Sequence, residues 1–299
     1  MSIRILLNGK KAGLEPVRNS IFAAREQGPV EVRTTWEAGD IERLVAEACR
    51  EGCTRLVAGG GDGTVNEVAD ALLQLPQADR PELAILPLGT ANDFATACGI
   101  PADLPTALAL AATGNTAEVD AIRANDRHFI NVASGGFAAE VTANTPVPLK
   151  NFLGGGAYTL SGMIQALNFV PYHGEFILPG ISMKEEVIVG AVCNGRQAGG
   201  GQVLAGGALI DDGQFDTVAL FRFPPAEVAE VVKALRDPSQ ESRYLRRFKA
   251  DWAEWACDME FPYNLDGEPM RARKIRFEVV PKSLRLVVPG NCPLLTANN

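Results

Sequence analysis

The hydrophobic pattern of the chain changes its period abruptly between positions 54 and 75. Residues 55–58 form a short, mostly apolar run, residues 59–64 read Gly-Gly-Gly-Asp-Gly-Thr, and apolar residues then recur at helical spacing at positions 65, 68, 72 and 75. This pattern predicts a strand, a glycine turn and a helix. The glycines allow positive φ and the close approach of a ligand, and Thr64 is expected to cap the helix. Free N–H groups at the start of such a helix form an anion site, which suits a phosphate.

One carboxylate, Asp62, lies inside this glycine turn. A loop that only holds phosphate gains nothing from a negative charge, whereas Asp62 could orient a metal ion, a ribose hydroxyl or a partner in another loop. The segment contains neither G-x-x-x-x-G-K-[ST] nor the G-x-G-x-x-G dinucleotide fingerprint. A plain strand-to-helix turn is the alternative, but the glycines exceed what that turn requires. The sequence therefore favours a catalytic loop.

Composition and charge limit the classes of protein to consider. The 299 residues are 46% hydrophobic and 21% charged, which is a globular balance in a chain long enough for two domains. No apolar stretch reaches the roughly 18 residues of a membrane-spanning helix, and the first residues do not resemble a secretion signal, so a cytoplasmic protein is expected. A net charge of −8 disfavours nucleic acid and acidic membranes as partners. Six scattered cysteines without a Cys-x-x-Cys pair predict reduced thiols.

Strands and helices alternate in the first part of the chain. Expected strands cover residues 3–7, 30–35, 55–58 and 83–86, with helical patterns after them and a further helix over residues 104–112. Alternating units of this kind predict a parallel sheet covered by helices, as in a Rossmann-like α/β domain. Ligands of such sheets bind beyond the carboxyl ends of the strands. Thr35, the glycine turn and Thr90 are therefore expected to lie along one edge of the sheet.

The pattern changes near residue 118, and strands dominate after it. Apolar runs and alternation predict strands at 119–124, 128–133, 187–193, 215–223, 252–257, 261–265, 275–280 and 284–288, with one amphipathic helix over residues 225–235. A β-sandwich is the simplest assembly of these strands. The boundary is placed near residue 127. This gives an α/β domain over 1–127 and a β-sandwich domain over 128–299, with a tail that could return to the first domain.

Several motifs carry a resemblance to a known family. Residues 60–67 read Gly-Gly-Asp-Gly-Thr-Val-Asn-Glu, and residues 87–95 read Pro-Leu-Gly-Thr-Ala-Asn-Asp-Phe-Ala. Together they resemble the catalytic domain of the diacylglycerol kinase family. The segments 194–201, 212–213 and 265–268 occur in the order expected of the bacterial YegS-like lipid kinases, so the resemblance covers nearly the whole chain. It implies a nucleotide domain of the NAD kinase and diacylglycerol kinase type, and an ATP-dependent transfer of the γ-phosphate to a lipid hydroxyl.

The resemblance also implies which residues contact ATP. These are Thr35, Gly61, Asp62, Gly63, Thr64, Val65, Asn66, Glu67 and Thr90. Considered without the resemblance, Thr35 is an ordinary threonine at a strand end. Glu67 could simply complement the dipole of the helix whose first turn contains it.

Acidic residues beside Gly213 form a candidate metal site. By resemblance, the carboxylate of Asp212 and the main-chain oxygens of Leu209 and Gln214 look like ligands for Mg²⁺ or Ca²⁺, which prefer oxygen donors. The family often has an apolar residue at position 214, but a carbonyl ligand survives that exchange. The alternative is an Asp-Gly turn with solvated acids.

A second Asp-Gly pair, at 266–267, reads as a hairpin turn between two strands. By resemblance, Glu268 corresponds to the proton acceptor of the family. A carboxylate held at a turn could take the proton of a lipid hydroxyl. Asp266 is the nearest alternative for that role.

The sequence carries less information about the acceptor. Phosphatidylglycerol and diacylglycerol are the lipids that we favour, and no pattern indicates an oligomeric state. Region 145–172 reads either as a helix packed on the sandwich or as a glycine-hinged flap that meets acyl chains. Membrane contact is expected to be transient and peripheral, at the inner face. Two other functions stay open: a kinase of a soluble acceptor such as NAD, and a nucleotide and lipid sensor without catalysis.

Overall fold

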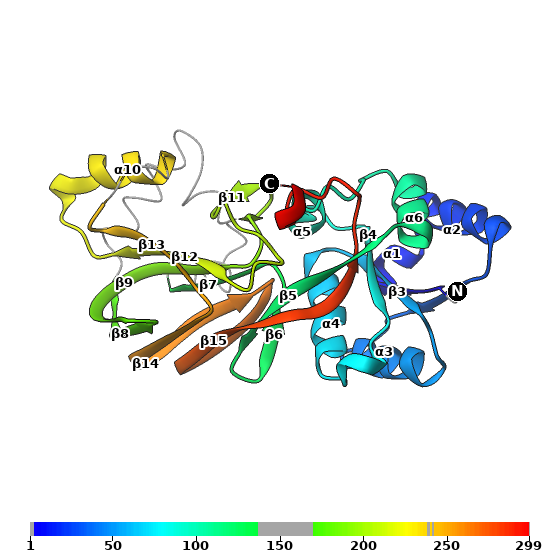
Figure 1. Ribbon diagram of the computed structural model, residues 1–299, viewed down its shortest axis with the longest axis horizontal. Helices are drawn as coiled ribbons and strands as arrows, with labels where there is room; N and C mark the ends of the chain where they lie inside the picture. Colours follow the sequence, from blue (N-terminus) through cyan, green and yellow to red (C-terminus); the bar gives the residue numbers. More distant parts are fainter. Residues whose placement is uncertain (1–2, 137–169, 238–239, 241, 299) are drawn as a thin grey trace. The chain divides into compact units, whose positions relative to one another are not determined.

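The computed structural model describes residues 3–136, 170–237, 240 and 242–298. The chain divides into two compact units, whose elements are labelled in Figure 1. Unit 1 comprises Met1–Ala121, Ile210–Asp212 and Val280–Asn299, and unit 2 comprises Ile122–Leu209 and Gly213–Val279. The predicted flap over 145–172 lies, up to residue 169, outside the described residues.

Unit 1 contains the expected parallel sheet. β1 (Ile3–Leu7) lies between β2 (Val30–Thr34) and β3 (Arg55–Gly60), and β4 (Glu82–Pro87) pairs with β3, all in parallel. The end of β15 (Glu268–Val287) adds a parallel strand beside β4, through the pair Leu286 and Leu83. β3 is buried at every position, because it lies inside the sheet and helices cover both faces.

The helices of unit 1 connect these strands and form two layers. They are α1 (Gly9–Ala12), α2 (Glu15–Gln27), α3 (Asp40–Arg50), α4 (Asp62–Leu73), η1 (Gln77–Asp79), α5 (Asp93–Ala97) and α6 (Leu104–Thr113). α2 and α6 cover one face of the sheet, and α3 and α4 cover the other (Figure 1). The core under α2 and α6 joins Val17, Ile21 and Leu108 of the helices to Ile5 and Val57 of the strands.

Unit 2 is built mainly of antiparallel strands. β5 (Thr116–Ala124) forms a hairpin with β6 (Arg127–Phe129), and the other long strands are β7 (Val132–Gly136), β8 (Tyr172–Leu178), β9 (Ile181–Cys193), β12 (Phe215–Phe221), β13 (Leu245–Ala250), β14 (Trp252–Leu265) and β15. Their order is β13-β12-β9-β7-β14-β15, and β8 pairs with both β9 and β14. β7, β9, β8 and β14 therefore close a ring of paired strands. The expected strand-rich second half is confirmed.

Smaller elements complete the described chain. β10 (Gln197–Ala198) pairs with β11 (Gln202–Val203), η2 (Pro225–Glu227) leads into the predicted amphipathic helix, α10 (Val228–Arg236), and η3 (Thr296–Asn298) lies near the C-terminus. None of the helices described is long and apolar enough to cross a membrane. No disulfide joins the six cysteines, as expected.

Several strand boundaries after residue 124 differ from the prediction. The segments 252–257 and 261–265 belong to the single strand β14, whose register against β15 shifts between Ala256 and Phe261. The segments 275–280 and 284–288 join in β15, which continues past Lys282 despite its positive φ and ends at Val287. Residues 128–133 divide into β6 and β7, because the N–H groups of Ile130 and Asn131 donate to a side chain. A bulge absorbs extra residues without ending a strand, and the hydrophobic period alone does not reveal it.

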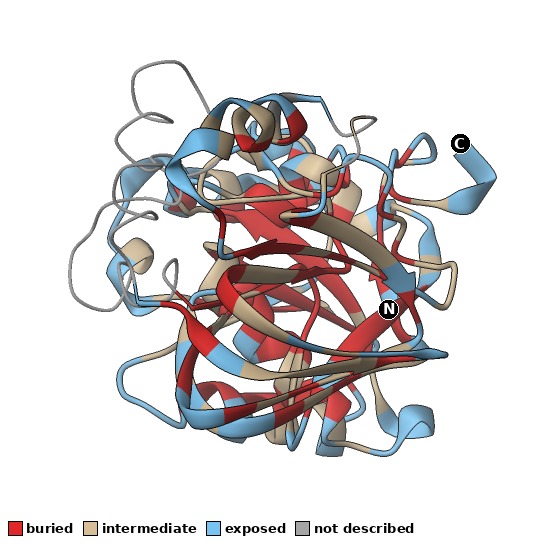
Figure 2. Ribbon diagram, turned by 90° about the vertical axis from the view of Figure 1, so that its left-hand side faces the viewer, coloured by how far each residue is buried: buried red, intermediate tan, exposed pale blue. Residues whose placement is uncertain are grey.

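Aromatic side chains fill the interior of unit 2. The ring of Phe261 lies 4.7 Å from that of Tyr172, 4.8 Å from that of Tyr263 and 5.7 Å from that of Trp255, measured between centroids. Burial among these rings raises the pKa of the Tyr263 phenol well above its usual value. The buried residues, red in Figure 2, follow the strands and the helix faces turned toward them.

Candidate functional site

The glycine turn lies at the carboxyl end of β3 and opens directly into α4. Gly61 is the N-cap residue and provides no side chain, so the predicted capping by Thr64 is wrong; Thr64 lies inside the first helical turn. In an α-helix the first N–H groups have no acceptor within the helix. Here they belong to Asp62, Gly63 and Thr64, and no hydrogen bond joins them to another described residue. Together with the positive end of the helix dipole, they form an anion site.

Close contacts explain the glycines on either side of this helix start. A Cβ on Gly60 would lie 2.4 Å from the side chain of Thr64, and a Cβ on Gly61 would lie 3.0 Å from Cα of Gly89. Conversely, a Cβ on Gly89 would lie 2.5 Å from Cα of Gly61. Gly63 differs, because a Cβ there would meet no described atom within 4 Å. The space around Gly63 is therefore open, whereas Gly61 and Gly89 let two loops touch.

The loop after β4 packs on the glycine turn. The N–H of Leu88 donates to the carbonyl of Gly60 over 2.8 Å. The N–H of Phe94 donates to Oδ1 of Asp62 over 3.2 Å. The structure thus brings the two predicted nucleotide loops together, and Asp62 has a partner in the second loop.

The loop after β4 has its own internal support. Asn92 has a positive φ of 52°, and its side chain accepts from the N–H of Gly89 over 2.8 Å and donates to the carbonyl of Gly89 over 3.0 Å. Thr90 lies between them and is exposed. The threonine that the sequence predicts as an ATP contact is therefore presented by a braced loop.

The ends of β1 and β2 lie at the same edge of the sheet. The side-chain amide of Asn8 donates to Oγ1 of Thr64 over 3.2 Å, and the N–H of Gly9 donates to Oγ1 of the half-buried Thr35 over 3.2 Å. The N–H of Thr35 also donates to the carbonyl of Leu7 over 3.1 Å. Asn8 was not among the predicted site residues. Its signal was its position directly after the mostly buried strand β1, just as Thr35 directly follows β2.

The first turns of α4 separate inner from outer residues. Val65 and Asn66 are only 4% and 1% exposed, whereas Glu67 is exposed. Both polar side-chain atoms of Asn66 are buried without a hydrogen-bond partner among the described residues. The side chains of Val65 and Asn66 are therefore turned away from the surface of this helix start.

The predicted metal ligands lie in the loop before β12, which turns at Gly213 with φ of 73°. Asp211 is held by Thr296, whose N–H and hydroxyl both donate to its carboxylate over 2.9 Å. No three His, Cys, Asp or Glu side chains gather into a metal-binding group within the described residues. One carboxylate with backbone carbonyls on a glycine turn still fits Mg²⁺ or Ca²⁺, since both ions take oxygen donors and water. Asp212 belongs to unit 1 and both Leu209 and Gln214 to unit 2, so their joint geometry stays a prediction.

The predicted hairpin turn joins β14 to β15. Asp266 and Gly267 have positive φ values of 48° and 104°, as a tight two-residue turn requires. The Asp266 side chain is buried, and its carboxylate accepts hydrogen bonds from the N–H groups of Ile130 and Asn131, over 2.9 Å each, and of Val132, over 2.6 Å. Both oxygens of Asp266 are thus occupied by backbone, and this residue anchors the turn.

Glu268 has a different environment from Asp266. It is the first residue of β15 and is half-buried. No hydrogen bond or ion pair joins its carboxylate to another residue in the described part of the chain. Of the two carboxylates at this turn, only that of Glu268 is available to a ligand.

Family models match both halves of the chain. Residues 2–124 match the diacylglycerol kinase catalytic domain, and residues 131–288 match the YegS C-terminal NAD kinase beta sandwich-like domain. A Shewanella frigidimarina protein named "probable lipid kinase YegS-like" is 48% identical, over 98% of this chain and 96% of that protein. A protein of the same name from Yersinia enterocolitica is 41% identical, over 97% of this chain and 98% of that protein.

A solved structure shares the fold. It is the crystal structure of a Bacillus anthracis protein assigned as a diacylglycerol kinase, with a TM-score of 0.79 and 23% identity over 97% of this chain and 96% of that chain. At that level of identity the similarity concerns the fold alone.

Proposed function

Because this chain belongs to the family of the YegS-like lipid kinases, we propose that it transfers the γ-phosphate of ATP to a hydroxyl group of a lipid. The observation that carries this proposal is the start of α4, where the N–H groups of Asp62, Gly63 and Thr64 are without a described partner. Phosphoryl transfer depends on positioning and on stabilising charge more than on covalent chemistry by the protein. A helix start with open N–H groups can both position a phosphate chain and stabilise its negative charge.

The loops around this helix start support the nucleotide part of the proposal. Gly61 lies against Gly89, and Asp62 accepts from Phe94, so the two loops form one preorganised surface. Thr35 and Thr90 lie at the ends of β2 and β4, on either side of the glycine turn in the strand order. This placement supports the proposed ATP contacts by Gly61, Asp62, Gly63, Thr64 and the backbone up to Glu67.

We propose a divalent cation, Mg²⁺ or Ca²⁺, as the second requirement. Asp212 would hold it with its carboxylate, and Leu209 and Gln214 with their main-chain oxygens. The donor set fits because hard cations take carboxylate and carbonyl oxygens and retain water. When bound, such a cation neutralises phosphate charge.

Glu268 is proposed as the proton acceptor. Its carboxylate has no partner among the described residues, whereas the carboxylate of Asp266 is fully engaged by backbone. The anchored Asp266 in turn fixes the turn that presents Glu268. In the proposed step, Glu268 takes the proton of the lipid hydroxyl as that oxygen bonds to the γ-phosphorus and the bond from phosphorus to the ADP oxygen breaks.

The test is transfer of labelled γ-phosphate from ATP with Mg²⁺ to phosphatidylglycerol and diacylglycerol in mixed micelles, with NAD and a sugar phosphate as soluble acceptors. Native protein, Glu268→Gln and the control Glu260→Gln, at an exposed position of β14, are compared. Labelled lipid from native protein and the control, reduced about 10²-fold or more in Glu268→Gln, supports the proposal. Transfer only to a soluble acceptor, or nucleotide binding without transfer, contradicts it.

The lipid acceptor also implies a place of action. We propose a transient contact with the inner face of the membrane, since none of the described helices could span a bilayer and the net charge of −8 opposes lasting binding to acidic lipid. Sedimentation with zwitterionic vesicles that contain diacylglycerol would test this contact. Equal sedimentation with and without the substrate lipid would contradict it.

A further inference from the structure

Trp36 is an aromatic residue that has no role in the proposed phosphoryl transfer. It is 94% exposed and follows Thr35 directly after β2. Large aromatic side chains bury most of their surface in folded proteins, so a nearly bare indole at a ligand-binding edge indicates a contact that is completed by another molecule.

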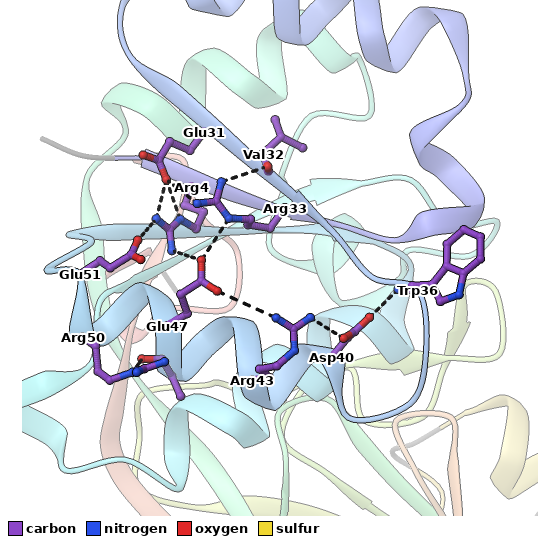
Figure 3. Close-up of polar contacts among 11 residues, drawn as sticks. Arg4, Glu31, Val32, Arg33, Trp36, Asp40, Arg43, Glu47, Arg50 and Glu51 are labelled. Atoms are coloured by element: carbon purple, nitrogen blue, oxygen red, sulfur yellow. Dashed lines mark hydrogen bonds and ion pairs between the residues drawn. The ribbon is translucent and has the colours of Figure 1, made fainter.

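The backbone that presents Trp36 is firmly held. Oδ2 of Asp40 accepts from the N–H of Trp36 over 2.6 Å and from the N–H of Glu37 over 3.0 Å. Oδ1 of Asp40 pairs with Arg43 over 2.6 Å, and Arg43 approaches Glu47 within 4.0 Å. Figure 3 shows this network and the indole of Trp36 pointing away from it. Hydrogen bonds therefore hold the backbone of this loop, while the indole of Trp36, its largest side chain, takes no part in that network.

The position of Trp36 matches the far end of a nucleotide bound at the glycine turn. β2 pairs with β1 and β1 pairs with β3, so two strand spacings, about 10 Å, separate the ends of β2 and β3. The intervening loop connects them, since Gly9 donates to Thr35 and Asn8 donates to Thr64. A separation of this order lies between the terminal phosphates and the base of an extended nucleotide.

The side of the glycine turn next to β4 is closed by the loop that follows β4. Gly61 and Gly89 approach so closely that a methyl group fits on neither, and the loop after β4 is bonded to the turn through Gly60 and Asp62. A ligand with phosphates at the start of α4 therefore extends toward the ends of β1 and β2. In open α/β sheets, ligands lie across the carboxyl ends of the strands in this way.

We propose that the indole of Trp36 stacks on the purine base of the ATP molecule whose phosphates bind at the start of α4. This inference rests on the proposed function and adds the residue that holds the base. Stacking on an aromatic ring accepts every base, because each base has a π face. Trp36 thus contributes affinity for the nucleotide without selecting adenine over guanine.

The test measures binding of ATP and of inorganic tripolyphosphate by calorimetry, and quenching of tryptophan fluorescence, with native protein, Trp36→Phe and Trp36→Ala. Trp252→Phe is the control, because Trp252 packs on Arg276 in unit 2. We expect ATP to quench native and control emission more than that of Trp36→Phe. Trp36→Ala should bind ATP about 5- to 150-fold more weakly, with tripolyphosphate unchanged and Trp36→Phe close to native.

Each other outcome overturns the inference in a recognisable way. ATP affinity within twofold of native in Trp36→Ala removes the stacking role and leaves the proposed function intact. Equal weakening for ATP and tripolyphosphate would mean that the variant disturbs the phosphate loop. Failure of native protein to bind either ligand would sink the proposed function as well. A blue shift of Trp36 emission with phosphatidylcholine vesicles, without a response to ATP, would make Trp36 a membrane contact instead.

Discussion

The carboxylate of Asp62 accepts a hydrogen bond from the backbone N–H of Phe94 over 3.2 Å. Phe94 is the second residue of α5, and the N-cap residue of that helix, Asn92, makes no side-chain cap bond. A side chain from the start of α4 therefore caps a different helix. Asp62 does have the loop partner that its sequence position suggested as one of three roles, and its charge lies beside the proposed phosphate site.

Substitution of Asp62 separates these two roles. Asp62→Asn keeps an acceptor oxygen for Phe94, so its free energy of unfolding should stay within about 0.5 kcal/mol of native, whereas Asp62→Ala should lose about 1 kcal/mol. Both variants should lose phosphoryl transfer by about 10²-fold or more if the charge organises the phosphates. Urea unfolding and the lipid phosphorylation assay measure the two effects. Full activity in Asp62→Asn would reduce Asp62 to a cap.

Gly63→Ala tests the phosphate site without disturbing the fold. A Cβ at Gly63 meets no described atom within 4 Å, and alanine favours a helix by about 1 kcal/mol over glycine, so stability should be equal or higher. Affinity for ATP should fall about tenfold or more, because the methyl group blocks approach to a helix N–H. Gly61→Ala is the contrast, since its Cβ would strike Gly89 and lower the melting temperature. Native ATP affinity in Gly63→Ala would place the phosphates elsewhere.

Asp266→Asn should destabilise unit 2. The carboxylate accepts backbone bonds from Ile130, Asn131 and Val132, and an amide replaces one acceptor oxygen with a donor that faces an N–H group. The expected loss in free energy of unfolding is about 2–4 kcal/mol. Urea denaturation measures it, with the exposed Asp258→Asn as the control, which should change by less than about 0.5 kcal/mol. Similar unfolding midpoints for the two variants would show that Asp266 anchors nothing.

Acid should loosen the loop that presents Trp36. The hydrogen bond from Arg43, with those from the N–H groups of Trp36 and Glu37, lowers the pKa of the Asp40 carboxyl to about 2. A lowered carboxyl pKa adds stability above the unfolded value of about 4, and that stability is lost as the pH falls from about 4 through 2.

Melting temperatures of native protein and Asp40→Asn therefore should differ at pH 5 and converge toward pH 2. The comparison between the two proteins cancels the titration of all other carboxylates. A constant difference across this range would mean that Asp40 does not contribute through its charge. At pH 7 the same variant should also weaken ATP binding, if Trp36 holds the base.

The strong periodic patterns predicted the fold of unit 1 well. β1 is apolar except for Arg4, and β3 and β4 are apolar after their first residue and end in glycine and proline. The rule that ligands bind at the carboxyl ends of parallel strands predicted that Thr35, the glycine turn and Thr90 lie along one edge. In unit 2 the pattern carries less information, because strands are half-exposed and bulged. β8 and β13 were not predicted, since charged and polar residues interrupt their alternation.

The site itself was predictable only where local pattern determines it. The anchoring of Asp266 depends on N–H groups more than a hundred residues earlier in the chain, which no spacing rule connects. The burial of Asn66 follows from the phase of α4, in which Val65 and Val68 also face inward, but the sequence gives no sign that its amide lacks a partner. For Thr64 the local pattern was misleading. Threonine is a good capping residue, but Thr64 lies three positions after Gly61, which is the N-cap residue of α4.

The contact between Gly61 and Gly89 has a consequence for how this family can vary. Neither residue can acquire a side chain while the other loop keeps its path, because the two Cα atoms already occupy the space that a methyl group would need. Separate point mutations at the two positions therefore lead to the same defect and cannot compensate each other. Gly63 differs, because a side chain fits there without disturbing the fold, so we expect substitutions at Gly63 only in relatives that no longer need to bind ATP. A relative that keeps Gly61 and Gly89 but has lost Gly63 would therefore retain the fold without the kinase activity.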